Sequence, residues 1–184
     1  GPELSYEQLM ENWQRHSKNI DELIEEIKSP TPANKEGGLS PEVVTRIPKS
    51  NFLLLRPLNK EALLSISSFQ LNQLEKKFKK KKLNGYPSFN FKFDKSVVEF
   101  LAIYGQSPEE SSRLIKDKLS SLIEATLSEA ISNKRITDEK QNYLISVQKN
   151  KDGTHSLLVK DNHSVQNLFV ELTKKDKYKQ PVSD

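Results

Sequence analysis

The chain has 184 residues, enough for one ordinary domain or for a small domain with part of another. Its 29 Lys and Arg residues against 25 Asp and Glu residues give a net charge of +4, weaker than the segregated excess typical of nucleic-acid-binding domains. The absence of cysteine excludes disulfides and thiolate metal sites, and the longest apolar run, Phe100–Tyr104, is far shorter than the ~20 residues of a membrane-spanning helix. We therefore expect a soluble protein of the cytoplasm or of an organelle matrix.

The N-terminal third of the chain predicts two helices separated by a loop. Residues 1–4 are set aside, because Gly1-Pro2 resembles the remnant of a cleaved expression tag. Apolar residues at helical spacing predict a single helix from Ser5 to about Lys28. Two prolines and a glycine pair then predict an exposed loop over residues 29–38.

A short helix is predicted next, with Ser40 as its N-cap and Pro41 at its first position. The apolar run Phe52–Leu55 has no polar face, which is typical of a strand covered on both sides in a parallel sheet. Asn59 is expected to cap a long helix that runs to about Leu83.

The middle of the chain predicts a strand and two further helices. Phenylalanines alternate with polar residues over Phe89–Phe93, the pattern of a half-buried strand. Asp94 is expected to cap a helix that ends at Gly105. Ser107-Pro108-Glu109-Glu110 carries a capping box and opens another apolar-faced helix, which extends to about Ile131 either as one helix or as two with a bend.

The last elements read as a hairpin. Two β-rich runs flank an Asp152-Gly153 turn, a strong hairpin signal. The hairpin and the Phe89–Phe93 strand together predict a small three-stranded sheet. Residues 161–184 are expected to form a C-terminal extension that is partly disordered, although apolar residues between Val165 and Leu172 leave room for one more short element.

Four segments share their order with motifs of a known family. They are Pro41–Pro48, Phe52–Leu58, Gly105–Arg113 and Leu122–Ile131. In this order they resemble the C-terminal part of Clp/heat-shock AAA+ unfoldases. That family has a helix ending in Arg-Ile-Asp, a hydrophobic strand before an Arg/His-Pro-Leu step, the motif Gly-Tyr-Asp-Pro-x-x-Gly-Ala-Arg, and an Ile-Glu-x-x-Leu-x-x-x-Ile helix. Each motif alone is weak, but the ordered set is fairly specific.

The resemblance implies roles for two arginines. Arg46 would be the arginine finger, which reaches the γ-phosphate of ATP bound in the adjacent subunit. Arg113 would be the second-sensor arginine, which contacts the ATP of its own subunit. A guanidinium suits both roles, because it stays charged and presents a planar fork to phosphate oxygens.

The resemblance also implies an α+β fold. A mostly helical AAA+ lid subdomain with a small sheet would span residues 59–160, preceded over residues 5–58 by a fragment of the α/β ATPase core. The parent would be a homo-hexameric unfoldase or disaggregase that uses ATP and Mg²⁺ to act on polypeptide substrates. None of the six glycines lies in a Gly-x-x-x-x-Gly-Lys-Ser/Thr loop, so we expect this chain alone to bind neither cofactor and to catalyse nothing.

Two alternatives remain open. Pro48 stands where the family has aspartate and Ser111-Ser112 where it has Gly-Ala, which favours a diverged pseudo-ATPase or adaptor that acts through protein contacts. The run Lys76–Lys82 suggests instead a basic helical nucleic-acid binder, although its lysines fit the solvated face of a helix equally well. Three scattered histidines and no cysteine predict no metal site, and neither nucleic acid nor a membrane is an expected partner.

Overall fold

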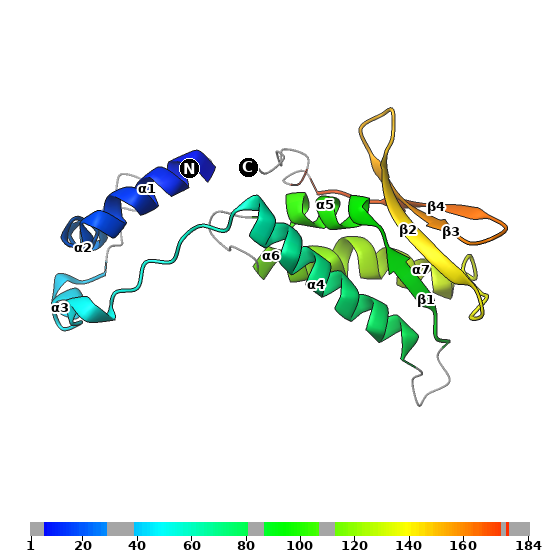
Figure 1. The fold of residues 1–184 in the computed structure, drawn as a ribbon, viewed down its shortest axis with the longest axis horizontal. Coiled ribbons are helices and arrows are strands. Elements are labelled where there is room, and N and C mark those ends of the chain that lie inside the picture. Colours follow the sequence, from blue (N-terminus) through cyan, green and yellow to red (C-terminus); the bar gives the residue numbers. More distant parts are fainter. Residues whose placement is uncertain (1–5, 29–38, 81–86, 107–112, 174–175, 177–184) are drawn as a thin grey trace. The chain divides into compact units, whose positions relative to one another are not determined.

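The computed structural model describes residues 6–28, 39–80, 87–106, 113–173 and 176 (Figure 1). The chain divides into two compact units, Gly1–Pro57 (unit 1) and Leu58–Asp184 (unit 2). The predicted loop over residues 29–38, the capping box at 107–110 and the last residues of the chain lie outside the described residues.

Unit 1 consists of short helices. These are α1 (Tyr6–Lys18), α2 (Ile20–Lys28), α3 (Pro41–Thr45) and the 3-10 helix η1 (Lys49–Asn51). The prediction of one helix up to Lys28 is wrong, because the chain breaks at Asn19. The Asn19 side-chain oxygen accepts a hydrogen bond from the backbone N–H of Glu22 at 3.4 Å, so this residue starts a second helix as an N-cap. The predicted short helix after Ser40 is confirmed as α3.

The prediction of a strand at Phe52–Leu55 is also wrong. The segment is extended, but no strand lies among the described residues of unit 1 to pair with it. Leu53 and Leu55 are 82% and 75% exposed, while the carbonyl of Leu54 accepts a hydrogen bond from Trp13 Nε1 at 3.5 Å. A strand forms only where a neighbouring strand hydrogen-bonds to its backbone, and an apolar sequence pattern does not indicate whether such a neighbour is present.

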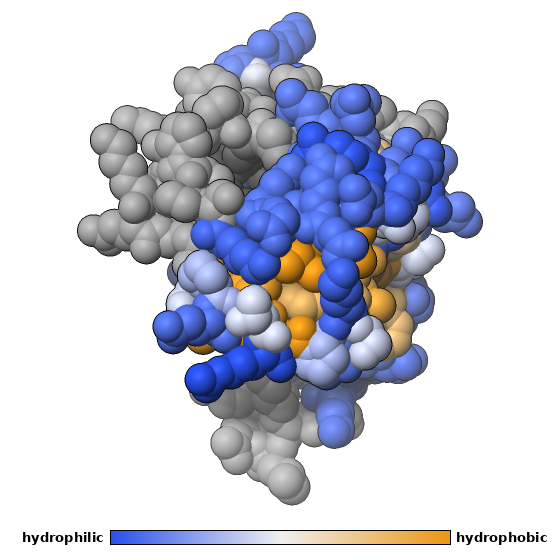
Figure 2. Space-filling model, turned by 90° about the vertical axis from the view of Figure 1, so that its left-hand side faces the viewer, coloured by the Kyte–Doolittle hydropathy of each residue, from blue (hydrophilic) through white to orange (hydrophobic). Residues whose placement is uncertain are grey.

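Unit 1 buries little apolar surface. Among its described residues, Ile24 and Val44 are the buried hydrophobic side chains, whereas Leu39, Val43 and the two leucines above are more than half exposed. Figure 2 shows exposed hydrophobic residues among hydrophilic ones on one side of the molecule. Two buried side chains make a very small core for a folded unit.

Unit 2 holds the helices that frame the core. They are α4 (Lys60–Lys79), α5 (Lys95–Tyr104), α6 (Arg113–Lys118), the π-helix η2 (Leu119–Glu124) and α7 (Ala125–Ser132). Both predicted caps are confirmed: Asn59 accepts from the N–H of Ala62 at 2.9 Å, and Asp94 accepts from that of Ser96 at 2.8 Å.

The sheet of unit 2 has four strands and not the predicted three. Its strands are β1 (Asn90–Phe93), β2 (Asn142–Lys149), β3 (His155–Lys160) and β4 (Val165–Val170), in the order β1-β2-β3-β4. β1 pairs with β2 in parallel and the other pairs are antiparallel, so the predicted hairpin is confirmed as β2–β3. The fourth strand, β4, lies in residues 161–184, which were expected to form a partly disordered C-terminal extension. Asp161 closes the turn before β4, because its side chain accepts hydrogen bonds from the N–H groups of His163 and Ser164.

The core of unit 2 lies between the helices and one face of the sheet (Figure 1). Phe91 stacks on Phe89 at 5.5 Å between ring centroids and meets Phe78 of α4 edge-on at 4.9 Å. The other face of the sheet exposes large side chains, such as Phe169. At the edge of the sheet, Arg135 Nη2 donates to the backbone oxygen of Asn167 in β4 at 2.9 Å and so occupies a carbonyl of the edge strand.

Candidate functional site

Arg113 is the first residue of α6. Its side chain is exposed and makes no hydrogen bond or ion pair with any residue that the structure describes, whereas Ile115, two positions on, is fully buried. Glu109 and Glu110, with which Arg113 was considered to pair, lie outside the described residues. Ile115 therefore anchors α6 in the core, and the guanidinium of Arg113 is exposed to solvent.

Gly105 determines where α6 lies. Its N–H donates to the carbonyl of Leu101 at 2.8 Å and ends α5 as predicted. A Cβ atom at this position would lie 2.7 Å from the Cα and Cγ1 of Ile115 and 2.7 Å from the oxygen of Leu101, closer than such atoms approach one another. The φ of Gly105 is −89°, an ordinary value, so the glycine is required by space and not by backbone conformation.

The far end of α6 is held by contacts that sequence reasoning missed. Lys118 forms an ion pair with the buried carboxylate of Asp176, at 2.6 Å. The helix then widens into the π-helix η2, a conformation often found at functional sites. Asp176 was assigned to the extension, and no local pattern in the sequence marks it as a partner of α6.

Arg46 is the C-cap residue of α3 in unit 1. Its N–H donates to the carbonyl of Val43 at 3.2 Å, and its side chain is exposed, with no polar partner among the described residues. Val44, two residues before, is 2% exposed and fixes the helix. Arg46 and Arg113 lie in different compact units, and both side chains are exposed with no polar partner among the residues that the structure describes.

Comparison with known protein families identifies the larger part of unit 2. Residues 58–145 match the family described as the C-terminal, D2-small domain, of ClpB protein. Residues 58–145 thus form a C-terminal small domain of the Clp-type AAA+ kind. No curated protein matches the chain.

The ClpB match covers one of the two predicted site residues. It begins at the start of unit 2 and ends within β2, so it includes Arg113 and the whole Gly105–Arg113 segment. Arg46 precedes the matched residues, and the roles of both arginines remain predictions. The rest of β2, β3 and β4 continue the sheet of the small domain beyond the match.

The lysine run forms the solvated face of α4 over its described part. Lys76, Lys79 and Lys80 are exposed, and Lys77 forms an ion pair with Glu124 of η2. Phe78, the aromatic residue within the run, packs against Phe91 in the core. The run therefore offers cations without the exposed aromatic side chains that stack on single-stranded nucleic acid.

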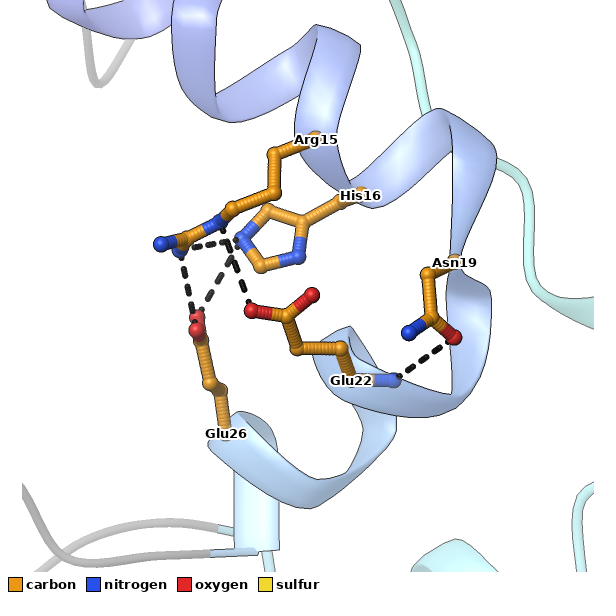
Figure 3. Close-up of polar contacts among 5 residues, drawn as sticks. All are labelled: Arg15, His16, Asn19, Glu22 and Glu26. Atoms are coloured by element: carbon orange, nitrogen blue, oxygen red, sulfur yellow. Dashed lines mark hydrogen bonds and ion pairs between the residues drawn. The ribbon is translucent and has the colours of Figure 1, made fainter.

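A polar cluster joins α1 and α2 in unit 1 (Figure 3). Arg15 Nη2 lies 2.9 Å from Glu26 Oε1, and its Nε lies 3.6 Å from Glu22 Oε1. His16 is 6% exposed, with Nε2 at 3.2 Å from Glu26 Oε2. All four side chains belong to the corner around Asn19, so we assign them to holding that corner together.

His155 of β3 is a half-buried base within the small domain. Its ring lies 5.3 Å from that of Phe100 and 5.6 Å from that of Tyr104, and its Nδ1 has no partner among the described residues. Burial, and to a smaller extent the charge of Lys149, lower the pKa of His155 below its ordinary 6.5. The folded domain therefore favours the neutral imidazole.

No group of three or more His, Asp or Glu side chains among the described residues is arranged to hold a metal ion. Nor is any described helix both long enough and apolar enough to cross a bilayer.

We expect Gly105→Ala to destabilise the small domain and displace α6. The added methyl group meets backbone atoms that cannot rotate away, and overpacking of this kind costs about 1–3 kcal/mol. Urea denaturation should show a lower midpoint than for the wild type, with Ser120→Ala, at an exposed position of η2, as the control. Equal midpoints for the glycine variant and the wild type would contradict the close approach.

Small-domain stability should fall as the pH decreases from 7 to 5. The unfolded chain takes up a proton on His155 near pH 6.5, whereas the folded domain, with its lowered pKa, resists protonation until the pH is lower. His155→Phe should flatten this part of the curve of unfolding free energy against pH. His163→Phe, at an exposed turn, is the control, and the same slope for wild type and His155→Phe would refute the assignment.

Proposed function

We propose that the chain is part of an ATP-dependent Clp-type unfoldase or disaggregase, to which it contributes a subunit-contact surface, the arginine finger Arg46 and the second-sensor residue Arg113. The observation that carries the proposal is the ClpB small-domain match, which includes Arg113 at the first described turn of α6 with no polar partner among the described residues. ATP and Mg²⁺ would be held by a phosphate-binding loop that this sequence does not contain.

The environment of Arg113 supports a nucleotide contact. A guanidinium paired with a carboxylate of its own domain would have to break that pair before it could reach a phosphate, and Arg113 has no such pair among the described residues. The backbone of α6 is fixed against Gly105, so the position from which the side chain reaches out is defined. Movement of the small domain would carry Arg113 with it, which would couple the phosphate state to the orientation of the domain.

The surface of unit 1 supports its assignment to a larger domain. It exposes Leu53 and Leu55 and buries two hydrophobic side chains among its described residues, too few for a self-sufficient core. An exposed apolar segment of this kind is suited to being covered by the rest of a larger domain. Arg46 would then stand at the surface of that domain, where a neighbouring subunit of a homo-hexamer could place its ATP.

In the intact ATPase, Arg113→Ala should raise the KM for ATP about tenfold or more. Loss of a hydrogen bond to a charged group typically costs about 1.5–3 kcal/mol, which corresponds to this change or a larger one. Steady-state ATPase assays measure it. Lys116→Ala, which removes an exposed cation from the same helix, is the matched control. Unaltered ATP affinity in the arginine variant would contradict the second-sensor role.

Arg46→Ala should instead lower kcat and leave ATP binding intact. A finger supplied from a neighbouring subunit stabilises the transition state of phosphoryl transfer, and its loss reduces turnover by roughly 10³–10⁵-fold in other enzymes. Arg46→Lys should recover little activity, because lysine lacks the planar fork. Full turnover in Arg46→Ala would refute the finger. Normal rates in both arginine variants would favour the diverged pseudo-ATPase or adaptor suggested by Pro48 and Ser111-Ser112.

A further inference from the structure

The carboxylate of Asp176 is buried and fully engaged. The residue is 1% exposed, although it lies well beyond the part of the chain that matches the ClpB small domain. Its Oδ1 lies 2.6 Å from Nζ of Lys118. Its Oδ2 accepts hydrogen bonds from the backbone N–H and the hydroxyl of Thr173, at 3.1 and 2.7 Å. A charge so buried is retained only where each oxygen has a partner.

The carboxylate stays ionised at neutral pH. Burial raises the pKa of Asp176, but the hydrogen bonds from Lys118 and Thr173 together lower it by more, so the pKa lies below the ordinary 3.8. Burial and, next, the charge of Asp176 raise the pKa of Tyr104, the last residue of α5.

Lys118 is the last residue of α6, and Arg113 is the first. The two lie about 7.5 Å apart along the helix axis. The backbone stays helical from α6 through η2 into α7, with αR dihedrals at Lys118 and Glu124. Two tertiary contacts hold its first described turns: Ile115 packs against Gly105, and Lys118 pairs with Asp176.

We infer that Asp176 is a positioning residue for Arg113: through Lys118 it fixes the orientation of α6 and so the direction in which the arginine reaches for nucleotide. The segment that follows the sheet thereby takes part in the site without touching ATP. This inference rests on the proposed role of Arg113.

The first test is hydrogen exchange of backbone amides in the 184-residue chain. Asp176→Asn keeps the shape of the side chain but leaves Lys118 without its counter-ion. Exchange in α6 should become at least about tenfold faster while β2 and β3 are unchanged, because breaking a buried ion pair loosens the elements it joins. Asp161→Asn is the control, since that carboxylate also accepts backbone N–H groups but lies in an exposed turn away from α6.

A milder variant covers the case in which Asp176→Asn does not fold. Thr173→Val removes one of the hydrogen bonds to the carboxylate and keeps the ion pair, so a smaller acceleration confined to the same helix is expected. Unaltered exchange of α6 in every folded variant at these two positions would overturn the inference.

The second test separates positioning from a general loss of structure. In the intact ATPase, Asp176→Asn should raise the KM for ATP severalfold, and in an Arg113→Ala background it should add nothing further. An equal rise in both backgrounds would overturn the positioning role while leaving the nucleotide contact of Arg113 intact. If Arg113→Ala alone leaves the KM unchanged, the proposed function of that residue fails instead, whatever the exchange of α6 shows.

Discussion

The small domain depends on one contact between backbones, where the end of α5 meets the start of α6. Gly105 has no side chain, so Ile115 of α6 can lie against it and fill the core. Any larger residue would force the helices apart. We infer that the exposed Arg113 owes its position to two contacts of α6, with Gly105 near one end and through the Lys118–Asp176 ion pair at the other.

Local chemistry made much of the fold predictable. Asn59 and Asp94 cap helices because their side chains meet N–H groups two or three residues on, and Asp152-Gly153 turns the β2–β3 hairpin because Gly153 takes a φ of 82°. Partners far away in the sequence decide the rest. Phe52–Leu55 has the composition of a strand but no strand beside it among the described residues, so it was wrongly predicted as one. β4 gains its place by pairing with β3, and its apolar residues had indicated only one more short element of unspecified type.

In the candidate site too, short motifs predicted some residues, whereas others depend on partners far away in the sequence. Arg113 and Arg46 were found from short motifs, and both side chains are exposed and free of described partners, as their expected roles require. The need for glycine at position 105 was attributed only to helix termination, since the approach of Ile115 depends on tertiary packing. No sequence pattern marked Asp176, because an aspartate in a polar C-terminal segment cannot be distinguished by sequence from a solvent-exposed one. The break at Asn19 was readable, but the apolar period across it suggested a continuous helix.

The parallel pairing of β1 with β2 has a consequence for synthesis on the ribosome. Asn90 of β1 meets Asn142 of β2, and all of α5, α6, η2 and α7 are translated between them. Until β2 emerges, β1 has no strand beside it, and Phe91 lacks Tyr143, whose ring centroid lies 5.6 Å away in the finished domain. A growing chain of this kind carries unpaired backbone groups and bare aromatic rings for as long as that stretch takes to make. The small domain thus passes through a nascent state that exposes the apolar rings its finished core will cover.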